Sequence, residues 1–193
     1  MNTKPSSSPP YTFEEYLEQS RAAEGRLEYH AGHIEAMAGA KGPHNRIQGD
    51  TYAYLSSMLR KQGGCRPYNS EQAVAIPAFD RYVYPDMSFV CEPEDQFTDE
   101  QELFLANPSL LIEVLSDGTE GRDRDEKLVW YNSLPSFREY VMIDSRKIAV
   151  RGFFRHDDQR WSIQNLYERQ QVLRLYSLGI DLPLAEVYRR VVF

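Results

Sequence analysis

The stretch SLLIEVLS, residues 109–116, decides the fold because it combines an unbroken apolar run with one central acid. Its five aliphatic side chains lack the alternation of a half-exposed strand, a pattern typical of a strand covered on both faces. Glu113 lies within the run, where an ionised carboxylate costs several kcal/mol unless a cation or hydrogen bonds replace its hydration. The stretch therefore predicts a central strand with an acid that needs a partner.

A plainer interpretation of Glu113 stays open beside this one. In it, the side chain lies at the solvent-facing end of the strand or forms a structural ion pair with an arginine or lysine. Only a second chemical group near Glu113 would favour a functional role.

A second acid precedes another apolar stretch, YVYPDMSFVC, residues 82–91. Pro85 has no backbone donor, so the strand is expected to begin at or just after it, with Asp86 at its start. Taken alone, Pro-Asp is a common turn dipeptide. Together with Glu113, however, Asp86 supplies two carboxylates on neighbouring strands, which can hold one hard divalent cation.

The segment GRDRDEKLVWYNSL, residues 121–134, predicts a helix over about 122–134 that ends before Pro135. Asp123, Lys127 and Tyr131 are spaced by four residues and share one face of that helix. This face either forms a solvated Asp–Lys pair or turns toward the carboxylates of the preceding strand. The spacing does not decide between the two.

The other elements predict an α/β (α+β) chain in which strands and helices are interspersed. A capping box at Thr12–Glu15 opens a helix that extends to about residue 24, and Pro43 and Gly63-Gly64 bound a helix over 44–61. The expected strands are a hairpin within 26–39, then 66–76, 82–91, 109–115, 138–144 and 147–155, and 161–193 mixes a short strand with a helix near 184–191.

Length and composition fit one domain over residues 12–193 after a disordered segment, 1–11. Of the 193 residues, 41% are hydrophobic and 26% charged, which is ordinary globular usage. Two cysteines are too few for a disulfide scaffold and lack metal-ligand spacing, so a reducing cytoplasm is the expected compartment. No apolar run approaches the roughly 20 residues of a membrane span, and no membrane partner is expected.

The net charge of −7 argues against a nucleic-acid binder that relies on phosphate neutralisation alone. Residues 92–102 hold six acids, however, and without them the net charge becomes −1. We expect this acidic loop to be mobile and outside the core. Residues 146–160 have five arginines and lysines against two aspartates, a local charge of +3. Charge therefore neither favours nor excludes a nucleic-acid partner.

The ordered set of motifs resembles the Uma-type putative restriction endonuclease family of the PD-(D/E)xK nuclease superfamily. The resemblance covers about residues 12–190 and implies a restriction-endonuclease-like core: a central mixed β-sheet flanked by helices, with an N-terminal helix and β-hairpin. The matching positions are RLEYHAGHIEAMAG at 26–39, His44, PD at 85–86, EVLS at 113–116, Thr119, Asp123, Lys127, Tyr131, EY-x-x-x-D at 139–144 and LGIDLPLAEVY at 178–188.

The resemblance implies an endonuclease that hydrolyses DNA phosphodiester bonds with Mg²⁺ or Mn²⁺. Asp86 and Glu113 would be metal ligands, with the backbone carbonyl of Val114 as a third. Leu115 occupies the position of the superfamily's strand lysine, and Lys127 on the following helix would replace that lysine. Glu28, His44, Asp123 and Tyr131 would support the site. Asp117 and Gly118 replace the family's usual Pro-Ser, and Val141 its common Trp, which affects the expected shape of the flanking loops.

Two other classes of function stay open. The chain could be a non-catalytic nucleic-acid-binding or regulatory module with a nuclease fold, or a homo-oligomeric assembly protein, since 13 tyrosines and nine phenylalanines could supply an interface. A homodimer is compatible with a nuclease. The cysteines lack a paired base, and the four histidines have no zinc spacing; His30 and His33 are expected on the hairpin surface.

Overall fold

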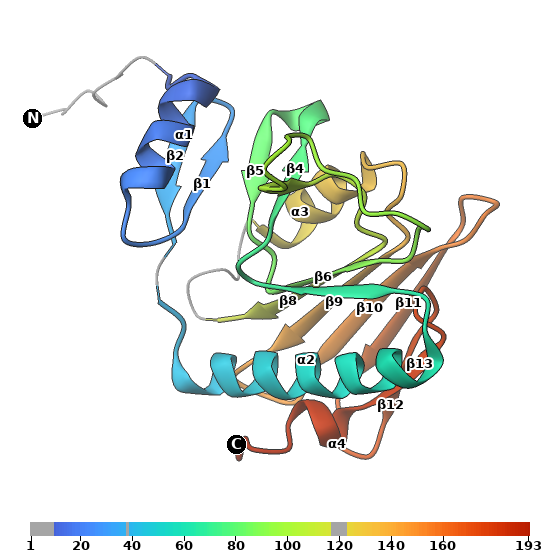
Figure 1. Ribbon diagram of the computed structural model, residues 1–193. Coiled ribbons are helices and arrows are strands. Elements are labelled where there is room, and N and C mark those ends of the chain that lie inside the picture. The colour runs from blue at the N-terminus through green and yellow to red at the C-terminus, as the bar shows by residue number, and fades with distance from the viewer. Residues whose placement is uncertain (1–9, 38, 117–122) are drawn as a thin grey trace, which may run out of the picture.

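Strand β8 (Leu110–Leu115), the run that contains Glu113, lies inside a six-stranded mixed sheet (Figure 1). The computed structural model describes residues 10–37, 39–116 and 123–193, with only the backbone for 123–125. All six residues of β8 are buried, as the unbroken apolar run predicts. In order across the sheet, the strands are β11 (Trp161–Leu166), β10 (Val150–Arg155), β9 (Glu139–Asp144), β8, β6 (Met87–Val90) and β3 (Arg66–Asn69); β8 and β9 are parallel, and the other neighbours are antiparallel.

Helices cover both faces of this sheet, which explains why β8 has no polar face. In Figure 1, α2 (Gly42–Gln62) lies below the sheet and α3 (Asp123–Asn132) above it. Ile112 and Val114 belong to the core that includes side chains of α2, the short helix α4 (Leu184–Val187) and the hairpin of β12 (Val172–Leu175) and β13 (Ile180–Pro183). Leu111 and Leu115 belong to a second core with side chains of α3.

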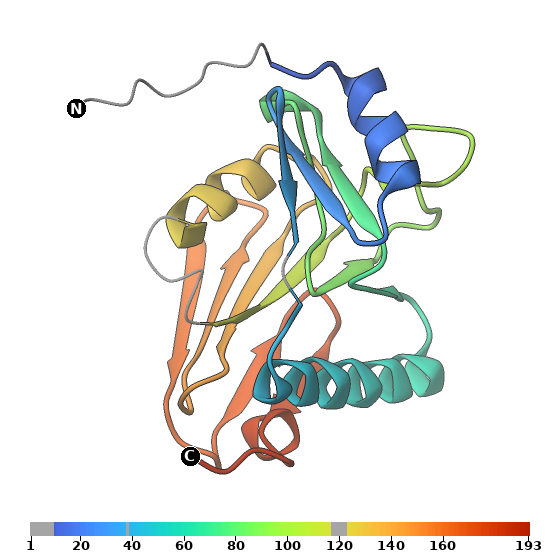
Figure 2. The ribbon, with the colours of Figure 1, turned by 90° about the vertical axis from the view of Figure 1, so that its left-hand side faces the viewer.

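A second sheet packs against the N-terminal helix α1 (Phe13–Ala22), as Figure 2 shows. The predicted capping box is present, since the Glu15 amide donates to Thr12 Oγ1 and the Thr12 amide to the Glu15 carboxylate. Tyr16 of α1 lies at 0% exposure among aromatic side chains of the sheet. The strand order is β2 (His33–Ala36), β1 (Leu27–His30), β5 (Arg81–Val83), β4 (Ala73–Ile76) and β7 (Phe104–Leu105). The predicted mixed α+β fold with an N-terminal helix and hairpin is confirmed.

Two stretches that were predicted as single strands are each divided between the two sheets. Residues 66–76 form β3 in the six-stranded sheet and β4 in the five-stranded sheet, and 82–91 form β5 and β6 in the same way. The second break falls at Pro85, which cannot donate a ladder hydrogen bond. The chain therefore passes from one sheet to the other directly before Asp86.

The predicted boundaries of helix α2 hold, whereas those of the C-terminal helix do not. Helix α2 begins beside Pro43 and ends at Gly63, whose φ of 75° suits glycine. The tail forms three strands rather than one, and its helix is limited to four residues. Between two of these strands, the Gln164 side chain of β11 both donates to and accepts from the backbone of Arg174 in β12. None of the helices in the described ranges combines the length and apolar character of a membrane span.

The N-terminal boundary of the folded part also differs from the prediction. Residues 1–9 of the predicted disordered segment lie outside the described residues. Tyr11, however, is tied to the hairpin: its amide donates to the Gly32 carbonyl at 2.8 Å, and its carbonyl accepts from the Tyr29 hydroxyl at 2.9 Å. The ordered chain thus begins before the predicted residue 12.

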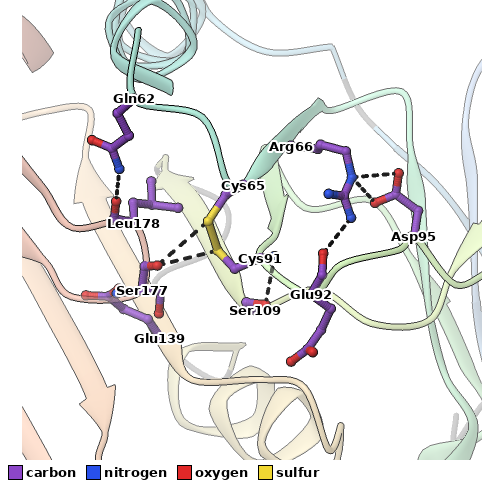
Figure 3. Close-up of a disulfide and its surroundings, with 10 residues drawn as sticks. All are labelled: Gln62, Cys65, Arg66, Cys91, Glu92, Asp95, Ser109, Glu139, Ser177 and Leu178. Carbon is purple, nitrogen blue, oxygen red and sulfur yellow. Dashed lines mark hydrogen bonds and ion pairs between the residues drawn. A yellow bond between two sulfur atoms is a disulfide. The ribbon is translucent and has the colours of Figure 1, made fainter. Parts of the chain in front are cut away.

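Cys65 and Cys91 form a disulfide, which the sequence analysis did not predict (Figure 3). They lie 26 positions apart in sequence, but the register that pairs Arg66 with Val90 places them opposite each other, with Cα atoms 4.1 Å apart. The bridge joins the end of α2 and the start of β3 to the end of β6. The carbonyl oxygen of Ser177 lies 3.5 Å from the Cys91 sulfur, so the bridge also contacts the C-terminal part of the chain.

The acidic loop at 92–102 has more contacts than its composition suggested. Asp95 pairs with Arg66, and the Asp99 carboxylate accepts the amides of Leu103 and Phe104 at 3.1 Å (Figure 3 shows the Arg66 pair). Phe97 packs against the core on the α3 side, so the expectation that the whole loop lies outside the core is wrong. An aromatic ring and inward-facing carboxylates anchor the loop despite its charge. Its mobility stays a prediction.

Candidate active site

Asp86 and Glu113 lie side by side where the two sheets meet. The register of β6 and β8 pairs Met87 with Ile112, and one step further it places Asp86 opposite Glu113. Residues directly opposite each other on antiparallel strands point to the same face, with Cβ atoms roughly 5 Å apart. The Asp86 carboxylate also accepts the Val114 amide at 2.7 Å, which fixes it against β8. The structure therefore brings together the two acids that the sequence singled out.

Helix α3 turns its predicted face toward Glu113. The Glu113 side chain accepts from Lys127 Nζ at 3.0 Å and from the Tyr131 hydroxyl at 2.8 Å, both at Oε1. Lys127 and Tyr131 are one helical turn apart, so one face of α3 presents both donors to the same carboxylate. The Asp123 side chain lies outside the described residues. The face that spacing alone left undecided thus points into the protein.

Charges within this cluster oppose one another. Burial raises the pKa of Glu113; Lys127 lowers it, and the negative charge of Asp86 raises it further. For Lys127, burial alone would lower the pKa, but the carboxylates of Glu113, Glu28 and Asp86 raise it above its ordinary value. Lys127 is consequently a protonated ammonium at neutral pH, enclosed by three carboxylates.

Glu28 of β1 reaches the same cluster from the second sheet. Its carboxylate accepts the Tyr84 amide at 2.8 Å and lies 3.2 Å from Nε2 of His30. Burial alone would raise the pKa of Glu28, but the hydrogen bond with His30, the charge of Lys127 and the hydrogen bond from the Tyr84 amide lower it. Glu28 is therefore an ionised carboxylate whose charge acts on Lys127.

The structure corrects the expected position of His30. Its ring is mostly buried, with Nδ1 2.5 Å from a guanidinium nitrogen of Arg81, which in turn stacks at 3.8 Å on the Trp130 ring. Because arginine only donates, Nδ1 accepts, and the ring proton lies on Nε2, which donates to Glu28. His33 is exposed on the hairpin as expected. The sequence missed Arg81 and Trp130 because their contacts join different elements.

His44 holds Asp86 from the opposite side, at the start of α2. Its Nε2 lies 3.3 Å from the Asp86 carboxylate, and Nδ1 is buried without a hydrogen-bond partner in the described residues. Burial alone would lower the pKa of His44, but Asp86 and then Glu113 raise it. One turn later, Gln48 donates to the Asp86 carbonyl at 3.1 Å. Its spacing of four from His44, which puts both side chains on one face of α2, is the local sequence signal for this residue.

The described residues do not gather three or more histidine, cysteine or acidic side chains in a metal-binding arrangement. The junction holds the adjacent carboxylates of Asp86 and Glu113, a third carboxylate at Glu28, the Lys127 ammonium and two histidine rings, His30 and His44. Thr119, Asp117 and Gly118, which entered the sequence comparison with the family, lie outside the described residues.

Comparisons with known proteins agree with the motifs. Two uncharacterized proteins of Synechocystis are 31% identical over 183 residues and 33% identical over 158 residues; the matches cover 93% and 80% of this chain and 92% and 86% of those proteins. A crystal structure described as a "putative nuclease belonging to DUF820", from Anabaena variabilis, matches with a TM-score of 0.74 at 20% identity, covering 93% of this chain and 98% of that one. This likeness confirms the fold.

The matching family model extends over nearly all of the secondary structure described above. It is the Uma2 model, described as "Putative restriction endonuclease", and it matches residues 13–185. That range includes both sheets, the acid pair and helix α3. The chain therefore belongs to the Uma2 family of putative restriction endonucleases.

Proposed function

We propose that this chain is a Mg²⁺-dependent endonuclease that hydrolyses phosphodiester bonds of DNA. The observation that carries the proposal is the Glu113 carboxylate, buried beside Asp86 and bonded by the Lys127 ammonium. A buried, charged and hydrogen-bonded cluster of this kind is expensive to maintain and is typical of a site that performs chemistry. Family membership and the nuclease-like fold support the same assignment.

The residues at the junction fit a hard divalent cation. Asp86, Glu113 and the Val114 carbonyl would hold Mg²⁺ or Mn²⁺ through oxygen atoms, the donors that these ions prefer. Two carboxylates leave room for water, as Mg²⁺ requires. Nε2 of His44, 3.3 Å from the Asp86 carboxylate, is a further polar group beside the place where the ion would be held. When bound, the ion would supply Lewis-acid polarisation of the phosphate and a bound water of lowered pKa.

The protein's own groups have separable roles in this proposal. Lys127, held as an ammonium by its three carboxylates, donates to the attacking water or to a non-bridging phosphate oxygen. Tyr131 fixes the position of Glu113, and His44 together with the Val114 amide fixes Asp86. Glu28 keeps Lys127 charged when the charge of Glu113 is taken up by a cation. Phosphoryl chemistry requires mainly positioning and electrostatics, which these groups provide.

The test is nicking of supercoiled plasmid and cleavage of single-stranded DNA with Mg²⁺ and with Mn²⁺. Asp86→Asn should abolish activity. Lys127→Met should reduce the rate by roughly 10²–10³, the scale of one positioned electrostatic group, and leave binding of the cation in place. Lys61→Met is the matched control, because Lys61 is an exposed lysine at the far end of α2. It should cleave like the wild type.

Equal activity in all four preparations would indicate a contaminating nuclease and reject the proposal. Loss of activity in Asp86→Asn but not in Lys127→Met would keep the acid pair and reject the role of the lysine. Complete inactivity of the wild type on DNA would favour the non-catalytic module instead.

A cytoplasmic location and a homodimer belong to the same proposal. Either is compatible with an endonuclease, and light scattering would measure the second. The Cys65–Cys91 disulfide is an argument against a reducing compartment, where such bonds are rare. The redox state of the two cysteines in protein isolated with thiol-blocking reagents would test the location.

A further inference from the structure

In the basic segment 146–160, some cations are bonded to neighbouring groups and others form no ion pair. Three of its arginines are bonded locally: Arg146 to Asp144, Arg155 to the Asn132 side chain and the Phe137 carbonyl, and Arg160 to Asp158. The other two cations, Lys147 and Arg151, form no ion pair with any described residue. Both line a single cavity of about 250 Å³.

This cavity lies on the same face of the six-stranded sheet as Glu113. Glu113 in β8 pairs with Met142 in β9, Met142 pairs with Arg151 in β10, and Arg151 pairs with Asn165 in β11. Residues in register on neighbouring strands point to the same face of a sheet. A row of side chains therefore runs from the acid pair to Arg151. The cavity walls include Met142, Arg151 and Asn165 of this row, with Lys147 and the exposed ring of Tyr167 beside them.

The distance along this row suits a nucleic-acid strand. Two strand spacings of about 4.8 Å separate the backbones of Glu113 and Arg151, roughly 10 Å in total. Glu113 and Met142 are buried and Arg151 is exposed, so a bound strand would not follow the row itself. With a rise of about 3.4 Å per nucleotide, a phosphate about three nucleotides from the acid pair would lie next to Arg151.

The acid in the cavity wall does not cancel the two cations. Asp144 is bonded by the Arg146 guanidinium at 2.7–2.9 Å. Burial alone would raise the pKa of Asp144, but the bonds and charge of Arg146 lower it, and the nearby charge of Lys147 lowers it further. Arg146 is the bonded partner of Asp144, and Lys147 interacts with Asp144 only through its charge. One acid therefore faces the two cations Lys147 and Arg151 in the cavity wall, which keeps a positive charge.

We propose that Lys147 and Arg151 bind a backbone phosphate of the DNA strand that is being cleaved, on one side of the scissile bond. The inference rests on the proposed function, because it takes its ligand from that reaction. It also explains how a chain with a net charge of −7 holds a polyanion. Most of the negative charge lies elsewhere, and the two available cations face the row that leads to the acid pair.

The experiment measures binding without cleavage. Fluorescence anisotropy of a labelled oligonucleotide is recorded in EDTA over a series of salt concentrations, with wild type and Lys147→Gln/Arg151→Gln. Each lost phosphate contact should weaken binding about tenfold near 0.1 M salt and reduce the slope of log K against log salt by about 1. Because both cations are assigned to one phosphate, the double variant should lose about tenfold in affinity and about 1 in slope. Lys147→Gln alone should show part of that loss.

A control with the same change in net charge is Arg160→Gln/Arg174→Gln. Arg160 pairs with Asp158 on the β10–β11 turn, and Arg174 of β12 pairs with Asp181 of β13. This control should bind DNA with the wild-type slope, and thermal melts of both double variants should match the wild type. Equal losses in the two double variants would mean a general charge effect and overturn the inference, as would an unchanged slope in Lys147→Gln/Arg151→Gln.

The outcome is separable from that of the proposed function. DNA binding that depends on Lys147 and Arg151, without any Asp86-dependent cleavage, would support this phosphate site and reject the endonuclease. Cleavage that depends on Asp86, with an unchanged slope in the double variant, would keep the endonuclease and reject the phosphate site. A wild type that binds no DNA in EDTA would overturn the phosphate site.

Discussion

Replacing Glu113 by glutamine distinguishes a cation site from a structural ion pair. Glutamine keeps the shape of the side chain and an oxygen that can accept from Tyr131, but it removes the charge. Lys127 is not left alone in the variant, because Glu28 and Asp86 also raise its pKa. Burial and Asp86 outweigh Lys127 in the wild type and raise the pKa of Glu113, so the ionised form of Glu113 lowers the free energy of unfolding.

The raised pKa of Glu113 sets the sign of the stability change in Glu113→Gln. A carboxyl group whose pKa is raised by folding stabilises the fold while it is protonated, and this contribution is lost as the pH rises through the folded pKa. At pH 8, Glu113→Gln should therefore be as stable as the wild type or more stable by about 1 kcal/mol. For a chain of 193 residues, that is an increase in Tm of about 0–4 °C. A structural ion pair would behave oppositely, with a loss of about 3–5 kcal/mol, or roughly 6–20 °C.

The assay is thermal unfolding with and without Mg²⁺. At a Mg²⁺ concentration of about 100 times Kd, the wild type should gain about 2.7 kcal/mol, or roughly 5–11 °C, and Glu113→Gln should lose this gain. Glu139→Gln is the matched control, since Glu139 is another buried carboxylate in the same sheet, bonded by the amides of Tyr176 and Ser177. It should keep the full Mg²⁺ effect.

Two results would refute the reasoning. A fall in Tm of more than about 6 °C in metal-free Glu113→Gln would show that the carboxylate mainly compensates Lys127. A wild-type Mg²⁺ effect that survives in Glu113→Gln at full size would place the cation elsewhere.

Three further predictions concern the rest of the fold. Burial raises the pKa of Glu139 to about 7, so the protonated form of Glu139 stabilises the protein below pH 4.5. As the pH rises to about 7, the free energy of unfolding should fall by about 3 kcal/mol at most. Urea unfolding at several pH values should show this fall, and Glu139→Gln should abolish it. Reduction of the Cys65–Cys91 bridge, which joins residues 26 positions apart, should cost about 3.5 kcal/mol by loop entropy; calorimetry with and without dithiothreitol measures it, and an unchanged Tm would contradict it. In hydrogen exchange, the Thr98 amide of the acidic loop, which donates to the Phe104 carbonyl, should exchange slowly while residues 92–95 exchange fast. Fast exchange throughout the loop would restore the original expectation of a wholly mobile segment.

Local sequence signals were enough for helices α1, α2 and α3 and for the central strand. The capping box at Thr12, Pro43 at the start of α2 and the unbroken apolar run around Glu113 each have a local physical cause, and each is present in the structure. The face of α3 illustrates the limit. Spacing showed that Lys127 and Tyr131 share a face, but only the packing of α3 on β8 shows where that face points.

Features that join distant segments could not be predicted from the local sequence. The division of 66–76 and 82–91 between two sheets depends on which neighbours each half finds, and a β-prone composition is the same in either sheet. The Cys65–Cys91 pair and the His30–Arg81–Trp130 stack arise from register and from the approach of the two sheets. The acidic loop was misjudged for a related reason, because one ring, Phe97, reaches the core.

The two edges of the six-stranded sheet bear on how copies of the chain could aggregate. At one edge, β3 has four residues, one of which is Pro67, and the disulfide beside it fixes its start. At the other edge, the Gln164 amide of β11 is bonded to the backbone of Arg174. Short, proline-containing or side-chain-covered edges resist the addition of a foreign strand. Partially unfolded molecules that lose the disulfide or the β12 contact would expose these edges first, so precipitation on storage should follow thiol reduction more closely than heating of the oxidised protein.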